Sequence, residues 1–229
     1  MHKEYSSHTF TEACEITIDQ SIVLYHGSKS GLDGDIQPIS RELCDFGRGF
    51  YMGTEKLQTL TLVYNFPRAK LYTVNVDLTD LHVLDLEVGI DWALQIAYHR
   101  GKLESIKGSE LYQKCSITLR DCDIVVGCIA NDRMFTVLDQ FFSGDITDVA
   151  LVNSLSALEL GKQYVALTGK ACSKIEILDE KLIESDERDF FRLESKKLRQ
   201  EGIRKAEEIC RKHRRDGRFF DEIISGGIN

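Results

Sequence analysis

The residues best suited to bind or react with a ligand are gathered between Tyr25 and Tyr51. The tetrapeptide YHGS at 25–28 places a histidine and a glycine directly after an apolar run, and FGRGFY at 46–51 combines two glycines with an arginine and three aromatic rings. An imidazole can exchange a proton near neutral pH, a glycine lets a ligand approach the backbone closely, and a tyrosine offers a ring face. His26 or Tyr51 alone is more simply explained by a place in the core, whereas the two together favour a ligand site.

Strands and helices in mixed order must position these residues. The run at 15–25 alternates and then becomes apolar, which predicts a strand ending at His26, and a short apolar segment follows at 50–52. Helical spacing begins after Thr54, an acceptable N-cap, and stops before Pro67. Further strands are expected at 70–78, 81–87, 122–130, 162–168 and 174–184, and helices at 91–100, 109–119, 131–144 and 147–161. Short turns join some strands and single helices join others, so the pattern predicts an α+β fold.

Composition narrows the class of protein. The chain has 229 residues, 42% of them hydrophobic, with two prolines and seven cysteines that form no CxxC pair. Scattered cysteines without metal spacing are typical of reduced thiols in a cytoplasmic protein. The N-terminal residues are polar, and the apolar runs are too short to span a bilayer, so no membrane association is expected. A net charge of −8 disfavours non-specific nucleic-acid binding by the whole surface.

The C-terminal part has a different character. From residue 188 to 218 the chain holds twelve Lys and Arg residues with acids interspersed, a pattern typical of a long charged helix. We therefore divide the chain into a domain at 15–180 and a charged helical extension at 181–229. The extension is either a solvated helix or a surface that recruits a partner protein or nucleic acid.

Several familiar motifs are absent or misleading. Asp45-Phe46-Gly47 spells the magnesium-binding triplet of protein kinases, but no glycine-rich loop, catalytic lysine or catalytic loop precedes it. The sequence has no GxxxxGK, HExxH or GxSxG motif, and its histidines show no spacing typical of metal ligands. We expect neither a kinase nor a metal site.

The order YHGS, then FGRGFY, then a helix resembles the ADP-ribosyltransferase superfamily, in its diphtheria-toxin and poly(ADP-ribose)-polymerase-like branch. More narrowly, YHGS, ISR and DFGRGFYMGT, followed by DIVVGCIANDR and QYVALT, resemble a bacterial family of formerly uncharacterised domains, the DUF3990-like family. The resemblance covers roughly residues 20–178. It implies a split β-sheet core with helices, to which the C-terminal helical extension is added.

The resemblance also implies residue roles. His26 would bind the adenosine ribose of NAD⁺, and Gly27 would hold the nicotinamide carboxamide through its backbone, with Ser28 as a helper. Tyr51 would stack on the nicotinamide ring, and Gly49 belongs to the same cofactor-binding block. The two blocks would lie on neighbouring strands, and the side chains of His26 and Tyr51 would line one cleft.

Three further residues are candidates for the same ligand. Arg41 lies in the loop between the two blocks, where a guanidinium could form paired hydrogen bonds with the pyrophosphate. A plain surface position explains it equally well. Asp132 and Arg133 follow the strand in DIVVGCIANDR, at a strand end where ligand groups would gather. A helix N-cap is the alternative for Asp132.

Gln163 stands where the superfamily usually has a glutamate at the start of a late strand. A carboxylate there stabilises the positive charge that develops on the ribose when the nicotinamide bond breaks, and a glutamine can accept the same hydrogen bond only as a neutral group. Charge-assisted hydrogen bonds contribute about 1.5–3 kcal/mol and neutral ones about 0.5–1.5 kcal/mol. The difference corresponds to about one to two tenfold steps in rate. Gln163 therefore predicts slow turnover.

Two functions follow from the resemblance. The first is an NAD⁺-dependent mono-ADP-ribosyltransferase that uses NAD⁺ as co-substrate and modifies a protein or nucleic-acid acceptor. Small members of such families often act as toxins in toxin–antitoxin or phage-defence systems, which would bring a cognate antitoxin protein as a partner. The second is a catalytically weak or dead module that binds NAD or ADP-ribose and works by interaction. Catalysis would rest on His26, Tyr51 and Gln163.

Overall fold

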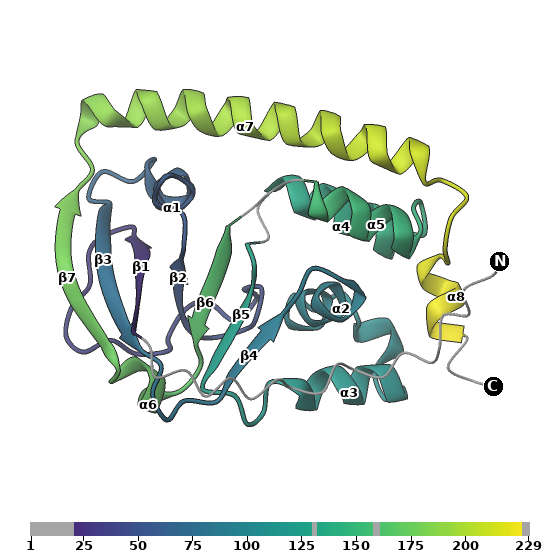
Figure 1. Cartoon of the computed structure of the whole chain (residues 1–229), viewed down its shortest axis with the longest axis horizontal. Helices are drawn as coiled ribbons and strands as arrows, with labels where there is room; N and C mark the ends of the chain where they lie inside the picture. Colours follow the sequence, from purple (N-terminus) through teal and green to yellow (C-terminus); the bar gives the residue numbers. More distant parts are fainter. Residues whose placement is uncertain (1–20, 130–131, 158–160, 226–229) are drawn as a thin grey trace.

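The computed structural model describes residues 21–129, 132–157 and 161–225. Their centre is one seven-stranded sheet in the order β4-β5-β6-β2-β1-β3-β7 (Figure 1). Neighbouring strands are antiparallel except for the parallel pair β4 and β5. The strands are β1 (Ser21–Ser28), β2 (Phe50–Gly53), β3 (Lys70–Asp77), β4 (Val83–Leu86), β5 (Ile124–Cys128), β6 (Lys162–Ala166) and β7 (Ile175–Leu182). The expected α+β class is confirmed.

Helices cover the sheet and fill the connections. They are α1 (Lys56–Val63), α2 (Ile90–His99), the 3₁₀ turn η1 (Glu104–Ile106), α3 (Glu110–Thr118), α4 (Asp132–Phe142), α5 (Asp148–Ser156), α6 (Gly169–Cys172), α7 (Ser185–Lys212) and α8 (Phe220–Ser225). Local signals explain many of their ends. The hydroxyl of Ser109 accepts a hydrogen bond at the start of α3, and that of Thr147 does so at the start of α5. Gly101 and Gly144 adopt positive φ angles just after α2 and α4.

The first strand differs from its expected extent. Residues 15–20 of the expected strand lie outside the described residues, and β1 continues past His26 to Ser28. The reason is tertiary, because every residue of β1 pairs with β3, from Ser21 opposite Asp77 to Ser28 opposite Lys70. His26 and Gly27 are thus inside the strand and not beyond its end.

The core lies on both faces of the sheet. On one face Leu24, Phe50 and Tyr72 are buried in a cluster that also includes residues of β5 and β6. On the other face α2, α4 and α5 cover β5 and β6 around Trp92 and Phe141. On that second face α1 covers β1 and β3, where Leu60 and Val63 pack.

The C-terminal extension packs on this core. Helix α7 runs along α1 at one end and along α4 and α5 at the other (Figure 1). Phe191 is buried with Leu60 and Val63, and Ala206 is buried with the α2, α4 and α5 cluster. The C-terminal extension therefore packs on the outside of two groups of helices and adds buried residues to both clusters.

Candidate functional site

The sheet is weakest between β1 and β2, and the YHGS and FGRGFY blocks meet there. Within the described chain these two strands share one register pair, Tyr25 with Gly53. Continuing that register would place Gly27 opposite Tyr51, but the strands are not paired there. The other side of β1 is paired with β3 over its full length. We call this unpaired stretch of β1 and β2, at Gly27 and Tyr51, the seam. Backbone groups of β1 that point toward it have no strand partner in the described part of the chain.

His26 bridges the seam with its side chain. Its Nδ1 lies 2.7 Å from the carbonyl oxygen of Tyr51, and since a carbonyl can only accept, Nδ1 carries the proton. The imidazole stacks on Phe50 with 4.1 Å between ring centroids. Burial lowers the pKa of His26 below its ordinary value of 6.5, and the hydrogen bond to Tyr51 offsets part of that shift. The ring is therefore neutral near pH 7, with Nε2 as an acceptor.

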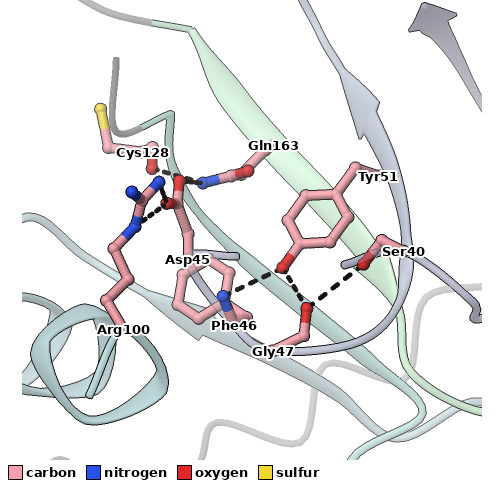
Figure 2. A network of polar contacts seen from close by, with 8 residues as sticks. All are labelled: Ser40, Asp45, Phe46, Gly47, Tyr51, Arg100, Cys128 and Gln163. Atoms are coloured by element: carbon pink, nitrogen blue, oxygen red, sulfur yellow. Dashed lines mark hydrogen bonds and ion pairs between the residues drawn. The ribbon is translucent and has the colours of Figure 1, made fainter. Parts of the chain in front are cut away.

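Tyr51 lies on the other face of the sheet. Its hydroxyl donates to the carbonyl of Gly47 at 2.7 Å and accepts from the amide of Phe46 at 3.0 Å (Figure 2). Burial raises the pKa of Tyr51 well above its ordinary value. Its ring packs with the cluster of α2, α4 and α5, whereas its neighbour Phe50 packs with His26.

The expectation that the side chains of His26 and Tyr51 line one cleft is therefore wrong. Successive residues of a strand point to opposite faces, and the pairing of β2 turns Phe50 toward the imidazole and Tyr51 away from it. The two residues are nonetheless joined, because the His26 ring binds the Tyr51 backbone across the seam.

Gln163 belongs to a buried polar network on the Tyr51 face. It pairs with Gly53, and its side-chain Nε2 donates to Asp45 Oδ2 at 2.9 Å and to the carbonyl of Cys128 at 3.0 Å (Figure 2). Arg100 donates to Asp45 Oδ1 from Nε at 3.0 Å and from an Nη at 2.6 Å. Asp45 and Gln163 are only 6% and 5% exposed. Sequence reasoning missed Asp45 and Arg100, although the DFG triplet drew attention to Asp45 for an unrelated reason.

The predicted glycines and Ser28 have packing reasons for their presence. A Cβ at Gly27 would lie 3.0 Å from Val63 Cγ2, and one at Gly49 would lie 2.4 Å from Val165 Cγ1. Both positions therefore need glycine for close packing. The hydroxyl of Ser28 donates to the carbonyl of Gly31 at 2.8 Å and so closes the following turn. Their roles toward a ligand stay predictions.

The remaining candidates lie apart from this network or outside the description. Arg41 is exposed in its loop. Arg48, later in the same loop, forms an exposed ion pair with Glu42 at 2.6 Å. Asp132 and Arg133 form the first turn of α4, and their side chains lie outside the described residues.

Taken together, the structure brings His26 and Gly27 on β1, Tyr51 on β2 and Gln163 on β6 to three neighbouring strands. The groups that this region could use for binding or catalysis are the neutral imidazole of His26, the unpaired edge of β1, and the buried amide of Gln163, which Asp45 holds. Among the described residues, no three His, Cys, Asp or Glu side chains gather as a metal site would require. Within the same residues, no helix has the length and apolar character needed to cross a bilayer.

Comparison with known proteins places the chain at the level of a family. No curated protein and no solved structure matches it. Residues 22–177 match the family model described as a protein of unknown function, DUF3990. That match covers β1 to the start of β7 and includes the seam and the Gln163 network. The chain therefore belongs to the DUF3990 family.

Proposed function

We propose that this protein binds NAD⁺ at the seam and transfers its ADP-ribose to a protein or nucleic-acid acceptor. The observation that carries the proposal is the seam itself, a strand edge opened in the middle of a sheet next to Gly27. A primary carboxamide has both a donor and an acceptor, so it can pair with free backbone groups as a neighbouring strand would. The nicotinamide carboxamide fits this requirement, and His26 Nε2 can accept a hydrogen bond from a ribose hydroxyl.

Gln163 supports a slow reaction. Cleavage of the bond between nicotinamide and ribose builds positive charge on the ribose, and an amide oxygen near the 2′-hydroxyl stabilises that charge less than a carboxylate does. Arg41, exposed in the loop between the two blocks, is the proposed pyrophosphate partner. An ADP-ribosyltransferase-like fold is part of the same proposal.

The direct test is an NAD⁺ titration combined with an assay for nicotinamide release. Wild-type protein should bind NAD⁺, and His26→Ala should weaken binding about tenfold, which equals about 1.4 kcal/mol. His82→Ala, at an exposed position, is the matched control and should bind as wild type does. Wild-type protein that neither binds NAD⁺ nor releases nicotinamide in the presence of cell extract would overturn the proposal.

The second candidate function is an NAD or ADP-ribose binding module with little or no turnover. The neutral Gln163 favours it, because an uncharged amide oxygen stabilises developing positive charge less than a carboxylate does. The same two assays separate the candidates: binding with no nicotinamide release under any condition supports the module.

We propose a toxin role in the bacterial cytoplasm, with an antitoxin protein as partner, on the resemblance alone. Expression in a bacterial host should arrest growth, and His26→Ala should relieve the arrest at equal protein level. Normal growth with abundant soluble wild-type protein would remove the toxin role and leave the NAD⁺ chemistry to be judged separately.

A further inference from the structure

The amide of Gln163 has one allowed orientation. Both of its N–H groups are directed at acceptors, one at Asp45 Oδ2 and the other at the carbonyl of Cys128. A carboxylate and a carbonyl cannot donate, so a flipped amide would set its oxygen against two other oxygens. Burial raises the cost of such a mismatch, since water cannot compensate. Gln163 therefore has only its oxygen to offer a ligand.

Asp45 is itself held in place. Two N–H groups of Arg100 bind Asp45 Oδ1, which leaves Oδ2 for Gln163 (Figure 2). The guanidinium of Arg100 lies 3.6 Å from the centroid of the Phe135 ring, which limits its movement. The adjoining turn is fixed by the hydroxyl of Tyr51 through Phe46 and Gly47. The carboxylate is thus a rigid support behind the amide.

We infer that Asp45 is a positioning residue that holds Gln163 as a hydrogen-bond acceptor for a ligand hydroxyl. The inference rests on the proposed function for the identity of that ligand, the ribose of NAD⁺. An acceptor beside the ribose stabilises positive charge as the nicotinamide bond breaks, whereas a donor in the same place opposes it. Asp45 thus acts on the reaction through Gln163 and sets what kind of group can be bound there. An anionic group is excluded.

Substitutions at positions 45 and 163 should therefore affect each other. Gln163→Glu alone would place a second carboxylate against Asp45 Oδ2 and the Cys128 carbonyl, where like charges repel. Asp45→Asn alone would remove one of the two acceptors that fix the amide and offer a donor in its place, so the orientation of Gln163 would no longer be set. Combining both changes moves the carboxylate from position 45 to position 163 with the total charge unchanged. The asparagine introduced at position 45 can then donate to the new carboxylate at position 163, while its oxygen stays on Arg100.

The experiment is this set of three variants, with Glu42→Gln as a control at an exposed ion pair. Thermal unfolding and the kcat and KM for nicotinamide release are measured for each. Both single variants should lower Tm by several degrees, and the combined variant should recover part of that loss, because the repulsion from Asp45 is gone while the Cys128 carbonyl still faces the new carboxylate. Asp45→Asn should lower kcat about tenfold with KM within about twofold, because the acceptor matters most in the transition state. The combined variant should reach or exceed wild-type kcat.

Two results would overturn the inference. One is additive Tm losses in the combined variant, which would mean that positions 45 and 163 are not coupled. The other is an Asp45→Asn enzyme with wild-type kcat and KM. Wild-type protein with no NAD⁺ binding would remove the proposed function instead, and the Tm cycle would still decide whether Asp45 fixes the amide.

A measurement on wild-type protein covers the case in which a variant fails to fold. With ¹⁵N-labelled glutamine, the side-chain amide protons of Gln163 should exchange with solvent at least tenfold more slowly than those of Gln37, which is exposed. Equal exchange rates for the two residues would show that Asp45 and Cys128 do not hold the amide.

Discussion

The buried histidines make stability depend on pH. Burial lowers the pKa of His99 to about 4, from an ordinary value of 6.5, and it also lowers the pKa of His26. As pH falls below 6.5, the unfolded chain takes up protons at these residues before the folded chain does. The stability that the neutral rings contribute is therefore fully present above pH 6.5 and is lost as the pH falls toward 4.

We expect His99→Phe to reduce this acid sensitivity. Phenylalanine keeps the edge contact with Tyr98, where the ring centroids are 5.1 Å apart, and removes the titrating group. For wild type, His99 contributes a slope of at most about 1.4 kcal/mol per pH unit between pH 6.5 and 4. Urea midpoints at pH 7.5, 5.5 and 4.5 measure it. His82→Gln is the control, and identical profiles for wild type and His99→Phe would contradict the prediction.

At the scale of residues, the sequence indicated the candidate residues but not the contacts between them. The family-like blocks led to His26, Gly27, Tyr51 and Gln163, which the structure brings to adjacent strands. The face on which Tyr51 lies depends on the pairing of β2 with its neighbours, and the pairing has no local signal. The ion pair of Asp45 with Arg100 joins residues 55 positions apart, so no spacing rule indicates it.

At the scale of elements, the loop before β2 packs closely against strand β6 at Gly49. Gly49→Ala would force a Cβ to within 2.4 Å of Val165 Cγ1 and 3.0 Å of the Ala166 carbonyl oxygen, which is backbone and cannot easily move. We expect a loss of about 1–3 kcal/mol in the free energy of unfolding, measured by denaturant titration. Gly169→Ala, with nothing within 4 Å of the added Cβ, should be neutral or slightly stabilising. Equal effects of the two changes would count against this packing.

Element types were predictable where a local signal marks an end. Glycines close α2 and α4 at Gly101 and Gly144, as expected from the sequence. Thr54 was expected to cap α1, but the N-cap is Glu55, and the Thr54 hydroxyl instead accepts from the amide of Lys162. A contact between residues 108 positions apart overrides the local preference there.

For the whole molecule, α7 is the element whose role the sequence did not indicate. Its composition predicted a charged helix, and among its described side chains only a few are buried. Phe191 is buried in one cluster and Ala206 in the other, with Cys210 packed against the second. At about 1.5 Å per residue Phe191 and Ala206 lie about 22 Å apart along the helix.

A matched pair of phenylalanines tests this packing. Phe191→Ala should lower the free energy of unfolding by about 3–5 kcal/mol, because the side chain is only 7% exposed between α1 and α7. Phe190→Ala removes a ring that is 56% exposed and should change it by less than about 0.5 kcal/mol. Guanidinium chloride titration measures the free energy of unfolding of both variants. Similar losses for the two would mean that α7 is not docked as described.

The single register pair at the seam has a mechanical consequence. Strand pairing this sparse cannot by itself keep the two halves of the sheet at a constant separation. Helix α7 packs with the cluster that includes Tyr25 of β1 and with the cluster that includes Tyr51 of β2. It therefore links the two strands across the seam. The separation of β1 and β2 is consequently held by a helix that packs across both strands on the outside of the molecule, and loosening α7 at either end would remove that constraint.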